Sequence, residues 1–146
     1  MEVSSNSSKE INKSNLNFKD GKYATGKRKT SIARIWLKKG TGKIIVNGKD
    51  YENYFKRANH KMQLLRPFEI LNQQTTYDVN CKVKGGGLTG QVGAMVNGIS
   101  KALVMIDPDS KSTLKKEKLT TRDSRAVERK KYGHRKARRS FQFSKR

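Results

Sequence analysis

The sequence has almost no cysteine and no long apolar run. Cys81 is the single cysteine among 146 residues, so the chain can form no internal disulfide, which suits a reducing compartment. With only His60 and His134 as nitrogen ligands, no spacing resembles a zinc site, and we interpret Cys81 as a small core residue. No apolar run approaches the roughly 20 residues needed to span a membrane. We therefore expect no metal and no membrane partner.

The first residues lack the features of a targeting segment. Residues 1–20 are rich in Ser, Asn and Lys and contain no apolar segment of a secretory signal. Glu2, Glu10 and Asp20, together with the absence of Arg, argue against a mitochondrial transit peptide. We expect a disordered polar extension over residues 1–21, and a cytoplasmic location is favoured over an organellar one.

Acidic residues are scarce, and the excess of positive charge is uneven. The chain has 34 Lys/Arg and 12 Asp/Glu, a net charge of +22. Residues 1–110 hold 19 and 9 of these, a net of +10, and residues 111–146 hold 15 and 3, a net of +12. The last 18 residues contain no acid and almost no aliphatic side chain, so they cannot offset the entropy lost on folding alone. Counterion release from a polyanion can order them, which favours nucleic acid as the partner.

Residues 22–110 carry the patterning of one compact domain. Side chains of residues 31–37 alternate between an apolar face and a mixed face, and residues 43–46 resume the pattern after Gly40-Thr41-Gly42. Two such runs around a break that contains glycine predict a β-hairpin.

Three short helices are expected, two within the domain and one after it. Asp50 is suited to cap a short helix that starts at Tyr51, because its side chain can accept from a free backbone amide. A second helix over about residues 59–65 is expected to end before Pro67, since a proline disfavours helical geometry in the preceding residue. A further short helix is expected around residues 112–119, before the basic tail.

The clearest strand and the clearest helix flank a run of three glycines. Residues 77–83 alternate between apolar and polar side chains, which predicts a strand with one buried face. After Gly85-Gly86-Gly87, apolar residues over 92–106 recur at steps of three and four, as the buried stripe of a helix requires. The small residues Gly93, Ala94 and Gly98 would let this helix lie close to a sheet or to RNA.

The order of these elements predicts the fold class. Strand, strand, short helices, strand and helix indicate an α+β domain over residues 22–110, with a mixed β-sheet packed with helices on one face. Residues 111–146 are expected to form a long basic C-terminal tail, first a short helix and then extended chain.

The glycine run also fits a nucleotide-binding pattern. Gly85, Gly87 and Gly90 satisfy GxGxxG, and Asp107 follows at about the distance of a ribose-binding acid. In a dinucleotide fold that acid ends a second parallel strand, whereas Asp107 directly follows the helix. We therefore expect a tight turn whose glycines allow close approach to packing neighbours or to an RNA phosphate. A nucleotide-dependent enzyme and a DNA-compacting protein stay as alternatives, separable by melting shifts with NAD or ATP and by competition between duplex DNA and rRNA.

Basic residues outside the tail favour an RNA-facing surface. Lys27-Arg28-Lys29 directly precedes the expected strand at residues 31–37, and Lys84 ends the strand before the glycine run. Aromatic residues are spaced among the tail cations, where they can stack on bases or pack on RNA or a neighbouring protein: Tyr132, Phe141 and Phe143.

Taken together, several segments resemble the bacterial form of small-subunit ribosomal protein nine, the universal S-nine family. They follow the family's order and spacing over about residues 22–146, and the terminal Ser144-Lys145-Arg146 is the most characteristic part. One departure is Asn97, where many relatives are expected to have histidine. The matching segments are TGKRKTSIARI (25–35), NGKDYENYF (47–55), KGGGLTGQVGA (84–94), LTTRDSR (119–125), VERKKYG (127–133) and ARRSFQFSKR (137–146).

The resemblance implies a non-catalytic structural constituent of the small (30S) ribosomal subunit, with an S5 domain-2-like fold in the subunit head. It implies no cofactor, no metal and no small-molecule substrate. The implied partners are 16S-type rRNA, the tRNA in the peptidyl site (P-site) and neighbouring head proteins. Ser144, Lys145 and Arg146 are implied to reach the anticodon stem-loop of that tRNA. The residues implied to hold rRNA are Lys27, Arg28, Lys29, Lys84, Gly85, Gly86, Gly87, Arg122, Arg125, Arg129, Lys130, Lys131, Arg135, Lys136, Arg138 and Arg139.

Overall fold

The computed structural model describes residues 20–145, and it has the expected α+β class. Residues 1–19 of the extension expected at residues 1–21 lie outside the described residues. Arg146 lies outside them as well. Along the described chain the elements are β1 (Lys22–Arg28), β2 (Ser31–Lys39), β3 (Ile44–Val46), β4 (Lys49–Asp50), α1 (Tyr51–Tyr54), α2 (Ala58–Ile70), β5 (Tyr77–Lys84), α3 (Leu88–Ile106) and α4 (Ser110–Lys116).

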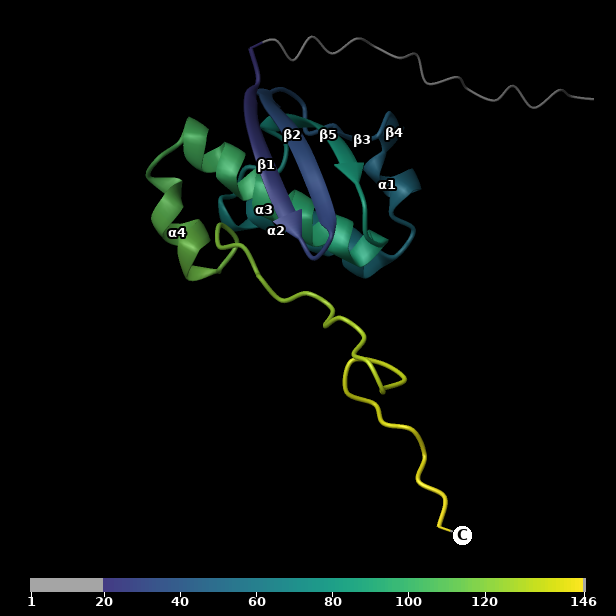
Figure 1. Ribbon diagram of the computed structural model, residues 1–146. Coiled ribbons are helices and arrows are strands. Elements are labelled where there is room, and N and C mark those ends of the chain that lie inside the picture. The colour runs from purple at the N-terminus through teal and green to yellow at the C-terminus, as the bar shows by residue number, and fades with distance from the viewer. Residues whose placement is uncertain (1–19, 146) are drawn as a thin grey trace, which may run out of the picture.

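The strands form one mixed sheet in the order β1-β2-β5-β3-β4. Neighbouring strands are antiparallel except β3 and β5, which run parallel. Helix α3 packs on β1 and β2, and α2 packs on α3, so the helices lie on one side of the sheet. Figure 1 shows the strands in front with α3 passing behind them. On the other face, which we call the open face, the outward side chains of β1, β2 and β5 are exposed or partly exposed within residues 20–145.

The expected hairpin between residues 31–37 and 43–46 is wrong. β5 lies between β2 and β3 and pairs with both. The side chain of Asp78, near the start of β5, accepts from the backbone amides of Thr41 and Lys43 at 2.8 and 2.9 Å. The Lys43 carbonyl in turn accepts from the Val79 amide at 2.8 Å. The glycine-containing loop is therefore bound to β5, a segment distant in the sequence, and cannot close a local turn.

Strand β1 was not predicted. Its inward positions are occupied by Ala24 and Gly26, so the segment shows no alternation of large apolar residues. The structure explains the small residues by the close approach of α3. A Cβ atom added at Gly98 of α3 would lie 2.6 Å from Ile35 Cδ1 and 3.0 Å from the Gly26 nitrogen. Of the two expected neighbours for this helix, the sheet is the one that Gly98 contacts.

Helix α2 continues past Pro67 to Ile70, so the expectation that it ends before Pro67 is wrong. Leu64, Pro67 and Phe68 are all buried on the same side of this helix. Burying these apolar side chains offsets the backbone hydrogen bond that a proline removes from a helix. Other local expectations are confirmed: Asp50 caps α1 by accepting from the Glu52 amide.

The core fills the space between the sheet and the helices. It contains the apolar face of β2 and the stripe of α3 that the sequence indicated, and Cys81 is fully buried within it. Burial raises the pKa of the Cys81 thiol to about 12, which fits a packing role. Leu114 of α4 is also fully buried, so α4 packs as part of the globular body.

Candidate nucleic-acid interface

One end of the sheet brings together cations that are far apart in the sequence. β1 ends at Arg28 and β2 begins at Ser31, and the register places Ile32 of β2 opposite Lys84 at the end of β5. The Ser31 hydroxyl donates to the Gly85 carbonyl at 3.0 Å, which joins the β1–β2 turn to the glycine run. We call this region the cationic end, defined as Lys27, Arg28, Lys29, Lys84 and the loop Gly85–Gly87.

The glycines of this loop make the close approach possible. Gly85 and Gly86 have positive φ angles of 74° and 61°, a conformation that strongly favours glycine. A Cβ at Gly85 would lie 2.6 Å from the Thr30 carbonyl oxygen. The loop is thus the tight strand-to-helix turn that the sequence predicted, and the packing neighbour is the β1–β2 turn.

Helix α3 begins in the same loop, which adds positive potential. Gly87 is its N-cap and provides no side-chain hydrogen bond to the first amides. The N-terminal amides of a helix have no partner within the helix and carry the positive end of its dipole. The first turn of this 19-residue helix therefore reinforces the lysine and arginine charges around it.

An ion-pair cluster holds the start of the tail against the cationic end. Asp123 lies 2.9 Å from the Arg28 guanidinium and 2.8 Å from that of Arg125. Arg28 also donates to the Arg125 carbonyl at 3.1 Å. Hydrogen bonds from Arg125, with the charges of both arginines, lower the pKa of Asp123 to about 2. We call Arg28, Asp123 and Arg125 the Asp123 cluster. The sequence argument did not single out Asp123, although it is one of only three acids in residues 111–146.

A small cleft lies where these segments meet. Its lining residues come from the β1–β2 turn, the glycine loop with the start of α3, and the tail: Lys29, Thr30, Ser31, Gly86, Gly87, Gly90, Ala126 and Val127. The cleft measures about 270 Å³, below the roughly 300–1,000 Å³ of typical small-molecule sites. Asp107, the expected ribose-binding acid, instead accepts a hydrogen bond from the Tyr77 hydroxyl at 3.4 Å. The geometry therefore does not favour a dinucleotide site.

Asn97 fixes the point where the chain leaves the body. Its side-chain amide donates to the carbonyls of Leu119 and Thr120, at 3.2 and 3.1 Å. The side chain is buried on α3, only 5 % exposed, and its amide nitrogen contacts the protein's own backbone. At the position where the family resemblance led us to expect histidine, the structure thus assigns a positioning role. Asn97 and Asp123 thus both hold the segment that follows α4, at residues 119–120 and at residue 123.

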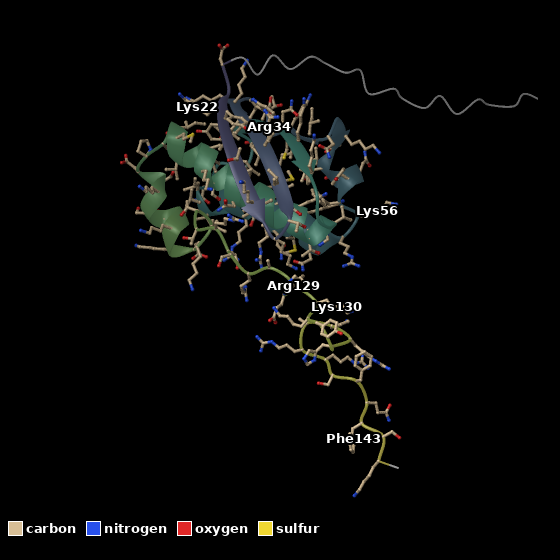
Figure 2. The ribbon with its side chains drawn as sticks, in the orientation of Figure 1. Lys22, Arg34, Lys56, Arg129, Lys130 and Phe143 are labelled. Atoms are coloured by element: carbon tan, nitrogen blue, oxygen red, sulfur yellow. The ribbon has the colours of Figure 1, made fainter. Side chains whose placement is uncertain are left out.

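Beyond α4, residues 117–145 form no helix or strand. Figure 1 shows this segment leading away from the body, and Figure 2 labels Arg129, Lys130 and Phe143 along it. Glu128 lies 2.9 Å from Arg138 and 3.9 Å from Lys131. The tail residues expected to contact rRNA all have exposed side chains: Arg122, Arg125, Arg129, Lys130, Lys131, Arg135, Lys136, Arg138 and Arg139. Of the residues expected at the tRNA, Ser144 and Lys145 are exposed, and Arg146 lies outside the described residues.

Among residues 20–145, no group of three or more His, Cys, Asp or Glu side chains is arranged to hold a metal ion. No helix there is both long enough and apolar enough to cross a membrane.

Comparison with known families identifies the chain. The family model described as ribosomal protein S9/S16 matches residues 26–146, which include the cationic end, the Asp123 cluster and the whole tail. Proteins of this family are structural, rRNA-binding components of the small ribosomal subunit, so the alternative of a nucleotide-dependent enzyme is wrong. Because the match covers most of the sequence, the chain belongs to the ribosomal protein S9/S16 family.

Proposed function

We propose that the protein holds 16S-type rRNA with its cationic end and its tail, and that the last residues of the tail contact the P-site tRNA. The observation that carries the proposal is the convergence of three segments at one end of the sheet. The β1–β2 turn, the glycine loop and the start of the tail meet there, joined by the Arg28–Asp123 contact of 2.9 Å. From this point the chain continues into the tail, whose last 18 residues contain no acid.

The tail has the chemistry of a segment that orders on RNA. Its cations alternate with few acids, and arginine can bind phosphate in a bidentate way while lysine acts as a point charge. A chain without its own core can enter spaces too narrow for a folded domain. In the sequence, Ser144, Lys145 and Arg146 are the tail residues most distant from Asp123, which supports assigning them to the tRNA anticodon stem-loop.

Three aromatic side chains of the tail are exposed to the surroundings of the protein. Tyr132 and Phe143 are at least 86 % exposed and Phe141 is 61 % exposed, which suits packing on rRNA or on neighbouring proteins of the subunit head. The mixed sheet with helices on one face supports an S5 domain-2-like fold.

Reconstituted small subunits test the tRNA contact. A chain lacking Ser144–Arg146 should assemble nearly as well as the full chain but bind P-site tRNA more weakly. The matched control replaces Lys115 and Lys116 of α4 by Ala, which removes the same number of positive charges from the body. Unchanged tRNA affinity in the truncated subunits would contradict the tRNA contact and leave the rRNA contact standing.

Salt dependence tests the rRNA contact. If the cationic end and tail make roughly six to ten phosphate contacts, the affinity for rRNA should fall by about 10³- to 10⁵-fold between about 50 and 200 mM salt. Competition with duplex DNA of equal length should favour rRNA. An affinity for rRNA that does not change with salt would contradict the rRNA contact. Equal affinity for duplex DNA would favour a DNA-compacting protein.

A further inference from the structure

The open face of the sheet carries further cations beside the cationic end, together with two aromatic side chains. On β2, Ser31, Ala33, Ile35 and Leu37 are buried beneath the helices, whereas the alternate side chains point to the open face. There Arg34 is exposed and Trp36 is partly buried, and Tyr23 of β1 and Lys82 of β5 lie beside them in the sheet register. We call Tyr23, Arg34, Trp36 and Lys82 the aromatic–cationic cluster.

Contacts within the cluster arrange two rings and a guanidinium group. Tyr23 and Trp36 are cross-strand partners with ring centroids 5.3 Å apart. The Arg34 guanidinium lies 5.8 Å from the Tyr23 ring centroid and 5.4 Å from that of Trp36, and its Nε donates to the Tyr23 hydroxyl at 3.2 Å. The Lys82 ammonium lies 5.9 Å from the Trp36 ring centroid. The aromatic side chains thus hold both cations on the surface.

The positive charge of this face is not neutralised within residues 20–145. Arg34 and Lys82 are direct cross-strand partners, an arrangement of like charges that destabilises a sheet. Neither forms a salt bridge with a described carboxylate. Asp78 also lies on this face of β5, but its carboxylate accepts from the amides of Thr41 and Lys43. A bound anion would remove the repulsion, so charge complementarity points to an anionic partner.

This surface adjoins the cationic end on the open face. Lys82 and Lys84 lie two residues apart on β5, so their side chains point to the same face. The two rings lie further away, because the strand separates Tyr23 from Arg28 by about 17 Å at the usual rise per residue. Figure 2 likewise places Lys22 and Arg34 toward the end of the sheet away from Arg129 and Lys130. An RNA strand held by the rings can therefore continue onto the cationic end.

We propose that the aromatic–cationic cluster binds unpaired nucleotides of the rRNA, with a base stacked on Trp36 or Tyr23 and the adjacent phosphates held by Arg34 and Lys82. Aromatic faces stack on any unpaired base, and nearby cations follow the backbone, which is how single strands are bound without sequence preference. Paired nucleotides do not expose their faces for stacking. The inference rests on the proposed rRNA function and adds the mode of contact on the open face.

Trp36 is the single tryptophan of the chain, so its fluorescence reports on this face alone. The full chain is titrated with an unstructured oligoribonucleotide and with an RNA duplex of equal length, and total binding is followed separately by filter retention. We expect saturable quenching of Trp36 by the unstructured RNA and little quenching by the duplex. Binding without any change at Trp36, or equal quenching by both RNAs, would overturn the inference. Failure of either RNA to bind would overturn the proposed function itself.

Variants separate stacking from charge. Trp36→Leu should lower the affinity for the unstructured RNA at least about fivefold, whereas Trp36→Phe retains a ring and should recover most of it. Replacing Arg34 and Lys82 by Gln should reduce the salt dependence, whereas the control that replaces Lys115 and Lys116 should not. Circular dichroism confirms that each variant is folded. Equal affinity of the Leu and Phe variants, or a change at Trp36 only when other small-subunit proteins are added, would refute RNA stacking on this face.

Discussion

The guanidinium of Arg28 lies 2.9 Å from the carboxylate of Asp123, which ties the last residue of β1 to the start of the tail. Neither residue is near the other in the sequence, so the contact depends on the completed sheet. Arg125 shares the same carboxylate at 2.8 Å, and Arg28 is therefore both an rRNA candidate and an anchor for the tail. The direction in which the tail leaves the body is set by this arrangement.

Replacing Asp123 by Asn should loosen the start of the tail without unfolding the body. The variant loses the ion pairs with Arg28 and Arg125, and trypsin should cleave after Arg122 and Arg125 faster than in the unchanged protein. The melting temperature should change little, because ion pairs that stay partly exposed to solvent contribute little to stability. Asp109→Asn, which removes an exposed acid outside the cluster, is the control. Equal cleavage rates in both variants would contradict the anchoring role.

The pH dependence of the Asp123 cluster follows from the lowered pKa. The folded-state pKa of Asp123 is about 2, below that of an aspartate in the unfolded chain. The contact therefore contributes its full stability at pH values above the unfolded-state pKa. This contribution is lost as the pH falls through the folded-state pKa. The side-chain carboxyl of Asp123, followed by carbon NMR, should titrate with a midpoint of about 2. Arg125→Ala should raise the midpoint, and an ordinary midpoint in the unchanged protein would show that the cluster does not form.

Gly26→Ala should destabilise the body strongly. An added Cβ would collide with the backbone of α3 at Ala94 and Gly98, which cannot move aside as a flexible side chain can. We expect the free energy of unfolding to fall by about 3 kcal/mol, measured by urea denaturation. Gly87→Ala is the matched control, since no atom lies within 4 Å of its Cβ position, and it should cost about 1 kcal/mol or less as a weaker N-cap. Similar losses in the two variants would argue against close packing of α3 on β1.

Asn97→Ala should weaken the exit of the tail from the body. The carbonyls of Leu119 and Thr120 lose their donor, which should lower the free energy of unfolding by about 1–3 kcal/mol. Hydrogen exchange should also rise at residues 117–120, next to the lost contact. Asn59→Ala, at an exposed position of α2, should leave both measurements unchanged. If it has the same effect as Asn97→Ala, the role assigned to Asn97 is wrong.

Local patterns predicted the elements whose own residues determine them. The strand at residues 77–83, the helical stripe over 92–106 and the Asp50 cap were predicted because alternation, periodicity and capping are local signals. The parallel pairing of β3 with β5 was missed because it depends on Asp78, which is distant in sequence. Strand β1 was missed because its inward residues are small to admit α3, a reason that exists only in the folded body.

The residues of the candidate site likewise divide into those that the sequence indicated and those that only the structure revealed. Composition was enough to name the cations of the β1–β2 turn, the glycine loop and the tail, because positive charge is visible residue by residue. Composition was not enough to find that Asp123 and Asn97 position the tail, since their partners are a distant guanidinium and two backbone carbonyls. The aromatic–cationic cluster needed the strand register, which places residues of three strands side by side.

Burial of Leu114 makes α4 the last piece of the globular body. During synthesis, the ribosome releases the sheet and its helices before the residues that follow α4, so the body can close first. A newly made copy then has a folded body and a strongly cationic tail that is not yet bound to a polyanion. Surplus copies would adhere to any exposed phosphate in the cell, which gives a physical reason to match production of this protein to production of its RNA.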